Sequence, residues 1–478
     1  MALLRLPEEL LIQIFSCLCI HCQNPCGFPN ADEPGVREDN TALVSLCLTS
    51  KQILAFAQPI LYHHYATGNI PPPSFTPRAG SYEYIYLSDS LPAFLSTIIR
   101  RPSLATHIRC LQLQEIEPHY HPSTLTPQVI RLLYDTSNAI GIETPFATEH
   151  VLDRILQGKE DISDLRSRIK LHQWLRALAI TLTPHTKKLI YGENPRCVST
   201  YNSLPDQPLP TLTSLKFNNA TRGCTFGMLQ SLLRKAPNLT LLHLTDYANT
   251  RTDRLPENVS LALPKLTRLV GEGAEIEIFR MVLGWCEEVR VVEYYCNRFL
   301  SEKGLLRALS PVKGVLRRLC YMDISGGPSR CGIDTPSEPI LGIRFNSGII
   351  RSLKEFCQLE ELVIDQWAFR YHDDFDEDSK RLIALLPESI QSVHFRYVYK
   401  SMMEELQQLA LAVPHSFPKL RSLKISVVDK WRVKHPTDER KRVERLRQMR
   451  SVETDFADVD VQVEWDVEGA TRVQTGGP

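Results

Sequence analysis

The segment 239–244, Leu-Thr-Leu-Leu-His-Leu, has apolar residues at its first, fourth and sixth positions. The same pattern, in places imperfect, also begins at residues 212, 266, 289, 316, 359, 390 and 420. With the start at residue 239 included, successive starts lie 27, 27, 23, 27, 43, 31 and 30 residues apart. A short strand of this kind cannot cover its own apolar face, whereas stacked copies share one continuous core. The sequence therefore predicts an α/β repeat protein with a parallel sheet.

Further strands are expected at residues 107–113, 186–190 and 459–467. Between the strands, apolar residues at helical spacing predict helices at 164–182, 226–234, 275–283, 302–309, 348–357, 379–386, 402–413 and 438–449. The period and the alternation resemble the leucine-rich-repeat family in an irregular form, because Ala220 and Tyr247 stand where that family has Asn or Cys. The resemblance implies a solenoid with a curved parallel sheet and outer helices over residues 82–469. The alternative is a non-solenoid α/β domain.

The N-terminal segment 6–18, Leu-Pro-Glu-Glu-Leu-Leu-Ile-Gln-Ile-Phe-Ser-Cys-Leu, forms one apolar stripe at helical spacing. Pro7 suits the first turn of a helix, and Glu8 and Glu9 favour its positive end. Apolar residues from about 43 to 48 and from about 50 to 65 predict two more helices, after a polar insertion at 19–40. The segments 6–18, 42–51 and 58–62 resemble the F-box family, the last as in many fungal members, with an insertion longer than the usual loop.

The F-box resemblance implies a small all-helical domain, residues 1–66, that binds the Skp-type adaptor of a cullin–RING ubiquitin ligase. The residues that would contact the adaptor are Leu6, Pro7, Glu9, Leu10, Ile14, Phe15, Leu18, Leu43, Val44 and Leu46. Without that resemblance, the first segment is simply an amphipathic helix packed on the rest of the chain. Pro71, Pro72, Pro73 and Pro77 predict a stiff linker at 67–81. Residues 470–478 are expected to be a disordered tail.

Side chains alternate along a strand, so those between the inward leucines should face the concave side of the sheet. These residues are Lys216, His243, Arg268, Glu293, Arg318, Val363, His394 and Lys424. Their mixed charge, with aromatic residues nearby, favours a protein target whose identity the sequence does not give. A solvated strand face without a ligand is the alternative for each of them.

The charge balance, 55 basic against 55 acidic residues, gives no support for nucleic acid or an anionic membrane as a partner. No apolar run reaches the roughly 18 residues that span a bilayer, and the acidic N-terminal segment does not resemble a signal peptide. We therefore expect an intracellular protein, cytoplasmic or nuclear. None of the common nucleophile, phosphate-binding, dinucleotide-binding or zinc-protease motifs is present, so we expect no enzymatic activity and no cofactor.

The densest group of thiols contains Cys17, Cys19, His21, Cys22 and Cys26. Zinc needs four ligands, and this segment could supply them, but the spacing does not match two paired C-x-x-C motifs. Reduced free thiols are the favoured interpretation, so no metal site is predicted.

The F-box and leucine-rich-repeat resemblances together imply the substrate-recognition subunit of an SCF-type (Skp–cullin–F-box) ubiquitin ligase. The F-box would bind the adaptor and the repeats would bind a target protein. A protein-interaction scaffold outside any ligase is the alternative. A third reading, an enzyme with a non-repeat α/β body, would require a deep polar pocket with perturbed titratable groups.

Overall fold

The computed structural model describes residues 5–25, 27–28, 34–67, 90–113, 125–145, 149–157, 165–192, 208–218, 226–245, 261–296, 302–323, 350–369, 380–398, 402–428 and 438–468. The chain divides into two compact units, Met1–Leu263 and Pro264–Pro478. The predicted linker at 67–81, apart from Thr67, and the predicted tail at 470–478 lie outside the described residues. Within the described part of the chain, no helix combines the length and apolar character needed to cross a membrane.

The described residues of the first unit include a parallel sheet whose strands follow chain order. The strands are β1 (His64–Ala66), β2 (Cys110–Leu113), β3 (Lys188–Gly192), β4 (Ser214–Asn218) and β5 (Leu241–Thr245). Their register aligns Leu111, Leu189, Leu215 and Leu242, all of which are buried. Burying each such side chain contributes roughly 1.5–3 kcal/mol, so the ladder of leucines ties each strand to the next.

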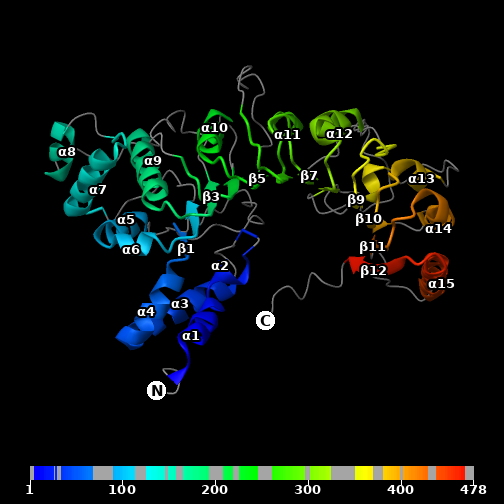
Figure 1. The fold of residues 1–478 in the computed structure, drawn as a ribbon, viewed down its shortest axis with the longest axis horizontal. Coiled ribbons are helices and arrows are strands. Elements are labelled where there is room, and N and C mark those ends of the chain that lie inside the picture. Colours follow the sequence, from blue (N-terminus) through cyan, green and yellow to red (C-terminus); the bar gives the residue numbers. More distant parts are fainter. Residues whose placement is uncertain are drawn as a thin grey trace. The chain divides into compact units, whose positions relative to one another are not determined.

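Further helices accompany this sheet. They are α5 (Leu91–Arg100), α6 (Pro102–Ala105), α7 (Pro127–Ile140), α8 (Glu149–Leu156), α9 (Leu165–Leu182) and α10 (Phe226–Lys235). α7 packs on α5, and α8 packs on α7. The α7 boundaries have local causes: the Thr126 hydroxyl accepts a hydrogen bond from the Val129 N–H at the start, and Gly141 adopts φ +73° at the end. Figure 1 shows α9 and α10 on one side of the strands and the first four helices on the other.

Those four helices are α1 (Glu8–Ser16), α2 (Ile20–Gln23), α3 (Pro34–Thr49) and α4 (Lys51–Leu61). They share a small core of buried side chains that includes Leu11, Phe15, Leu43, Ile53 and Ile60. The predicted first helix is confirmed. The predicted polar loop at 19–40 is wrong in part, because α2 lies within it and α3 begins at Pro34, a residue suited to the first turn of a helix.

The third N-terminal helix is shorter than predicted. It ends at Leu61 rather than near Tyr65, and His64–Ala66 form β1. The backbone of this segment bonds to the sheet: the carbonyl of His63 accepts from the N–H groups of both Arg109 and Cys110, each at 2.9 Å. The end of the predicted F-box segment is therefore an edge strand of the repeat sheet.

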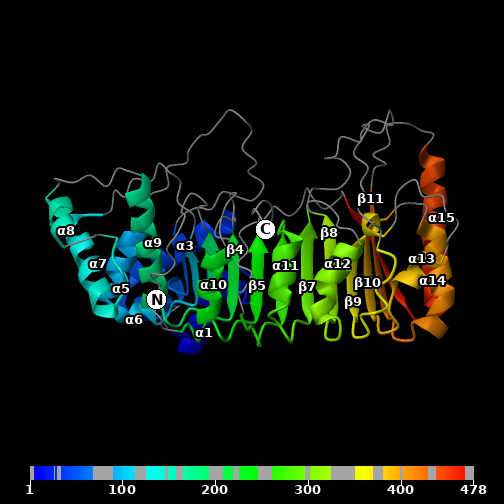
Figure 2. The ribbon, with the colours of Figure 1, turned by 90° about the horizontal axis from the view of Figure 1, so that it is seen from above.

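The described part of the second unit also has parallel strands in chain order. They are β6 (Arg268–Glu272), β7 (Val291–Cys296), β8 (Arg318–Asp323), β9 (Glu361–Asp365), β10 (Ser392–Val398), β11 (Ser422–Val428) and β12 (Gln462–Glu468). Figure 2 shows the strands of this unit side by side with helices along them. The helices are α11 (Ile276–Leu283), α12 (Glu302–Leu309), α13 (Arg381–Leu385), α14 (Met403–Ser416) and α15 (Asp438–Ala457).

The α/β repeat prediction is confirmed, since every predicted strand coincides with an observed one and the pairings within each unit are parallel. The helix predicted at 348–357 is wrong, because residues 350–360 form turns. Ile350, Leu353 and Phe356 are buried without a helix, and their spacing of three residues misled the prediction. Two backbone N–H groups bond to other segments instead. The N–H of Ile350 donates to the carbonyl of Ala368, and the N–H of Leu353 donates to the carbonyl of Leu385.

Candidate protein-interaction surfaces

The first candidate surface lies on α1, where the predicted adaptor-binding residues separate by exposure. Leu10 and Ile14, one helical turn apart, are each 43% exposed, and Ile12 is 44% exposed. Phe15 is buried in the helical core, although it was predicted to contact an adaptor. Large apolar side chains normally turn inward, so this pair at i and i+4 forms an apolar stripe that the described residues leave partly exposed.

A similar division occurs on α3. Val44 is 44% exposed and Leu48 is 82% exposed, again one turn apart, whereas Leu43 is buried in the core. The sequence analysis missed Leu48 and Ile12. The other predicted contact residues are intermediate or exposed: Leu6, Leu18 and Leu46 are half-buried against the core, and Pro7 and Glu9 are exposed. Phe15 and Leu43 therefore hold the helices together, and the exposed pairs are available to a partner. We call Leu10, Ile14, Val44 and Leu48 the apolar helix surface.

The open face of the first unit's sheet is occupied in part by its own chain. Register aligns Lys216 with His243, and both were predicted to lie on that face. The ring of Phe28 lies 6.1 Å from the ring of His243. The ammonium group of Lys188 donates to the backbone carbonyls of Asn24 and Gly27. The segment after α2, within the predicted insertion, therefore packs on strands β3 and β5 and reduces the area that a target could reach there.

In the second unit, the register places the predicted residues in two neighbouring rows of one face. Glu293, Val363, His394 and Lys424 lie in one row, in which Cys320 stands between Glu293 and Val363. Arg268 and Arg318 do not belong to that row, because Val270 and Cys320 align with Glu293 instead. Both arginines sit two residues earlier on their strands, so they lie on the same face but in an adjacent row. The shift arises because the apolar pattern fixes which face a side chain takes but not its exact level along the strand.

Opposite charges pair across neighbouring strands on this face. Arg318 lies 3.3 Å from Glu361, which is its register partner. Lys424 lies 2.6 Å from Glu464, also its register partner, and this contact raises the pKa of the lysine and lowers that of the carboxyl. Exposed cross-strand pairs of this kind are screened by solvent, so they stabilise the sheet only slightly. The face is thus mixed in charge rather than uniformly basic.

Glu293 is a buried carboxylate at the centre of a group whose other polar side chains are less buried. Its two carboxylate oxygens accept from Arg268 at 2.7 Å and from the Tyr295 hydroxyl at 2.9 Å. Burial is the main reason that the pKa of Tyr295 is raised, so the phenol stays protonated and can donate. Burial likewise raises the pKa of the neighbouring Cys320 to about 12, which leaves a protonated thiol rather than an activated nucleophile.

A β-bulge in β10 brings Arg396 and Tyr397 together. Phe395 pairs with Ile425 and Val398 pairs with Val427, so two residues of β10 stand opposite one residue of β11. Tyr397 takes a φ of +55°, which is unusual for a residue with a side chain. Bulges turn a side chain away from the regular alternation. Here the Arg396 guanidinium lies over the Tyr397 ring, 5.0 Å from its centre.

Arg396 has two further partners on neighbouring strands. One of its guanidinium nitrogens is 3.8 Å from the fully buried carboxylate of Asp365 and 2.5 Å from the sulfur of Met322. The guanidinium is thus held between an acid, a thioether and an aromatic ring. We call Asp365, Arg396 and Tyr397 the arginine cluster. Counting two residues on from His394 would have found Arg396, but no sequence signal located the bulge.

His394 contributes a hydrogen bond within the same face. Its Nε2 lies 2.8 Å from the hydroxyl of Ser426, and that hydroxyl lies 3.5 Å from Asp466. In a serine-protease relay the carboxylate accepts a hydrogen bond from the second imidazole nitrogen. Here the carboxylate of Asp466 lies near the Ser426 hydroxyl instead. Burial, followed by the charges of Arg396 and Lys424, lowers the pKa of His394 to about 4. The imidazole is therefore neutral at pH 7 and serves as a hydrogen-bonding group.

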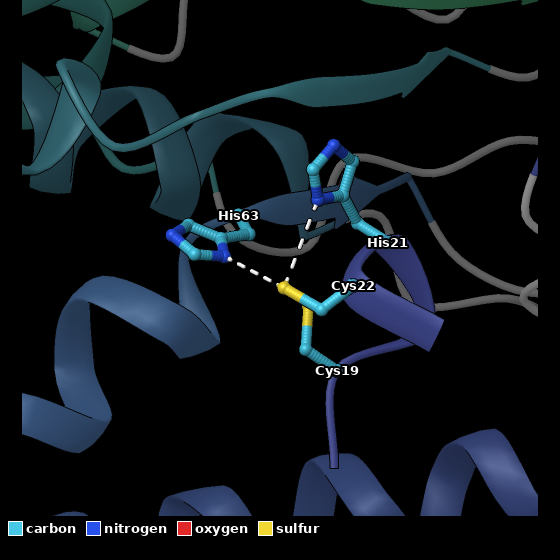
Figure 3. A group of neighbouring side chains, drawn as sticks. All are labelled: Cys19, His21, Cys22 and His63. Carbon is cyan, nitrogen blue, oxygen red and sulfur yellow. Dashed lines mark hydrogen bonds between the residues drawn. The ribbon is translucent and has the colours of Figure 1, made fainter. Parts of the chain in front are cut away.

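A cluster of possible metal ligands lies in the first unit. Cys19, His21 and Cys22 come from the start of α2, and His63 from the turn after α4, as Figure 3 shows. The sulfur of Cys22 lies 3.3 Å from Nδ1 of His63 and 3.9 Å from Nδ1 of His21. Cys17 points elsewhere and donates to the carbonyl of Gln13, and Cys26 lies outside the described residues. The sequence analysis grouped these thiols but missed His63.

A comparison with models of known protein families and a comparison with curated proteins find no match to this chain.

Proposed function

We propose that this protein is the substrate-recognition subunit of an SCF-type ubiquitin ligase. In this proposal, the N-terminal helices form an F-box that binds a Skp-type adaptor, and the adaptor links the protein to a cullin. The sheet belongs to an irregular leucine-rich-repeat body that holds a target protein. The observation that carries the proposal is the apolar helix surface, four large apolar side chains exposed on two helices of a unit with a well-packed core.

The apolar helix surface offers a modest gain in free energy on binding. Its four side chains are between 43% and 82% exposed, so burying what remains, at roughly 1.5–3 kcal/mol for each full side chain, gives a gross gain of about 3–6 kcal/mol. The costs of association and of ordering side chains remove part of this gain. Helices that present paired apolar residues to a groove are a common way for two proteins to bind. Phe15 and Leu43 contribute indirectly, by fixing the helices that carry the exposed pairs.

The second unit supplies the proposed target site. Its open face combines ion pairs of both signs with Tyr295, Tyr397 and the arginine cluster. Arg and Tyr are enriched where proteins bind one another, and paired charges discourage partners of uniform charge. The protein would perform no chemistry itself. Its contribution would be to hold the target close to the ubiquitin-carrying enzyme, which raises the effective concentration of target lysines.

The test uses the full chain with a double substitution, Leu10→Glu with Ile14→Glu. Both side chains are exposed, so the variant should fold normally while losing most of its binding to a purified Skp-type adaptor, at least tenfold in Kd. Leu411→Glu is the matched control, because Leu411 is an exposed leucine (69%) on a different helix. Deletion of residues 1–66 is a poorer test, since it also removes β1 from the sheet.

Three results would count against this proposal. Unchanged adaptor binding by the double variant, or no binding by the unmodified protein, would refute the F-box assignment. If the adaptor binds but cullin does not join the complex, the protein would instead be an interaction scaffold outside a ligase.

A further inference from the structure

Four side chains in the first unit converge with the chemistry and spacing of a metal site. Their donor atoms, two sulfurs and two imidazole nitrogens, all lie within 4.8 Å of one another. A tetrahedral zinc ion has Zn–S bonds of about 2.3 Å and Zn–N bonds of about 2.0–2.1 Å, so its sulfur–nitrogen edges are about 3.5 Å. The two Cys22 sulfur–nitrogen distances, 3.3 and 3.9 Å, fall on either side of that length.

The backbone around these ligands is fixed. The N–H of Cys22 donates to the carbonyl of Cys19 at 2.9 Å, which closes the turn that brings the two thiols together. The carbonyl of His63 is held by β2, as described above. The rings of His21 and His63 meet edge to face, with their centres 5.8 Å apart. Three ligands from one short segment and one from the turn after α4 are thus positioned before any ion binds.

The charges and burial also suit zinc. Cys19 is buried and the other three residues are half-buried, so the site is shielded but reachable. Binding converts two thiols to thiolates and releases two protons, and the resulting centre of one Zn²⁺ and two thiolates is neutral. A neutral centre is compatible with the nearby ammonium group of Lys188. Mixed sulfur and imidazole ligands in a tetrahedral arrangement favour zinc over calcium, magnesium or manganese.

We propose that Cys19, His21, Cys22 and His63 bind one structural zinc ion. The ion would join α2 to the turn that leads into β1. It would therefore clamp the N-terminal helices to the edge of the repeat sheet in the first unit. The loop that it closes runs from residue 22 to residue 63, so the ion would act as a cross-link that restrains the unfolded chain. This proposal is independent of the F-box assignment, because it concerns only the attachment of the helices to the sheet.

The first experiment measures the zinc content of the full-length protein, expressed with added zinc and purified without chelator. We expect one zinc per chain in the unmodified protein and a loss of most of it in Cys22→Ser and in His63→Asn. Cys17→Ser is the matched control, because Cys17 lies on the neighbouring helix turn and its thiol bonds to Gln13. The control should keep its full zinc content.

A second measurement covers the case in which the variants fail to fold. Zinc is removed from the unmodified protein under reducing conditions and replaced by Co²⁺. Two thiolates and two imidazoles around Co²⁺ give sulfur-to-cobalt charge-transfer absorption and the intense visible bands of a tetrahedral site. Addition of zinc to the metal-free protein should raise its Tm.

Four outcomes would overturn the proposal. They are unmodified protein without zinc, a Cys19–Cys22 disulfide in protein purified under reducing conditions, a Co²⁺ spectrum without thiolate bands, and equal zinc loss in Cys17→Ser and Cys22→Ser.

Discussion

The guanidinium of Arg396 lies 5.0 Å from the centre of the Tyr397 ring, and the two residues are adjacent in the sequence. Neighbouring residues of a regular strand point to opposite faces. The β-bulge removes that constraint by giving Tyr397 a left-handed backbone conformation. Stacked arginine and tyrosine are typical of the points at which protein interfaces are strongest.

Two substitutions of Tyr397 distinguish the effect of its backbone conformation on stability from the effect of its ring. Both Tyr397→Gly and Tyr397→Ala remove the ring, but only glycine adopts a φ of +55° without strain. The glycine variant should therefore be about 1 kcal/mol more stable than the alanine variant. Urea denaturation of both proteins measures the difference. Equal stabilities would mean that the bulge relaxes when the ring is removed.

Ile14 and Phe15 form a matched pair on α1, since one is 43% exposed and the other only 1%. Ile14→Ala should change the free energy of unfolding by less than about 0.5 kcal/mol and weaken binding to a Skp-type adaptor about tenfold. Phe15→Ala should destabilise the helices by about 3–5 kcal/mol, because it leaves a cavity in their core. Thermal unfolding and calorimetric titration with the adaptor check both values. Comparable destabilisation by the two substitutions would contradict the assigned exposures.

Glu293 is buried and holds two partners, whereas Glu361 forms an exposed pair with Arg318. Glu293→Gln should lower the free energy of unfolding by about 1–3 kcal/mol, because it weakens a charge-assisted hydrogen bond at a buried position. Glu361→Gln serves as the control and should cost less than about 1 kcal/mol. Chemical denaturation at pH 7 compares the two. If Glu293→Gln lost less stability than Glu361→Gln, Glu293 would not be the centre of this polar group.

His394 should make the protein less stable in acid. Burial comes first among the causes that lower its pKa from 6.5 to about 4, followed by Arg396 and Lys424, against the opposing effects of Asp466 and Glu464. Between these pH values the unfolded chain binds a proton that the folded chain does not. The stability that the protein gains from a neutral His394 is therefore complete above pH 6.5 and is lost as the pH falls towards 4.

The variant His394→Gln keeps a polar partner for Ser426 but does not titrate. Denaturation at several pH values between 7 and 4 should show the unmodified protein losing more stability than this variant. Parallel curves for the two proteins would show that His394 titrates normally. Titration of the imidazole resonance by NMR gives its pKa directly.

The apolar pattern in the sequence was sufficient to locate the strands. Its three inward positions, as in Leu239, Leu242 and Leu244, are fixed by burial, and burial is what the sequence records most clearly. The same reasoning failed at Ile350, Leu353 and Phe356, because apolar residues at this spacing can be buried by turns as well as by a helix. Local pattern does not reveal which neighbour will satisfy the backbone N–H groups of such a segment.

The candidate sites were predicted less well because they depend on contacts between distant segments. The F-box resemblance selected Ile14 and Phe15 together, but only packing shows that one is exposed and the other buried. His63 joins Cys22 only when α4 returns to the sheet, so no spacing rule could include it. The packing of Phe28 near His243 likewise depends on the path of an insertion with no periodic pattern.

Within each unit, every strand pairs with the strands that come just before and just after it in the sequence. A growing chain therefore never waits for a distant segment before it can extend the sheet. As the polypeptide leaves the ribosome, each new strand and its helix find a template that has already been synthesised. Because α1 to α4 precede every described strand in the chain, their shared core can form before the C-terminal strands have been translated.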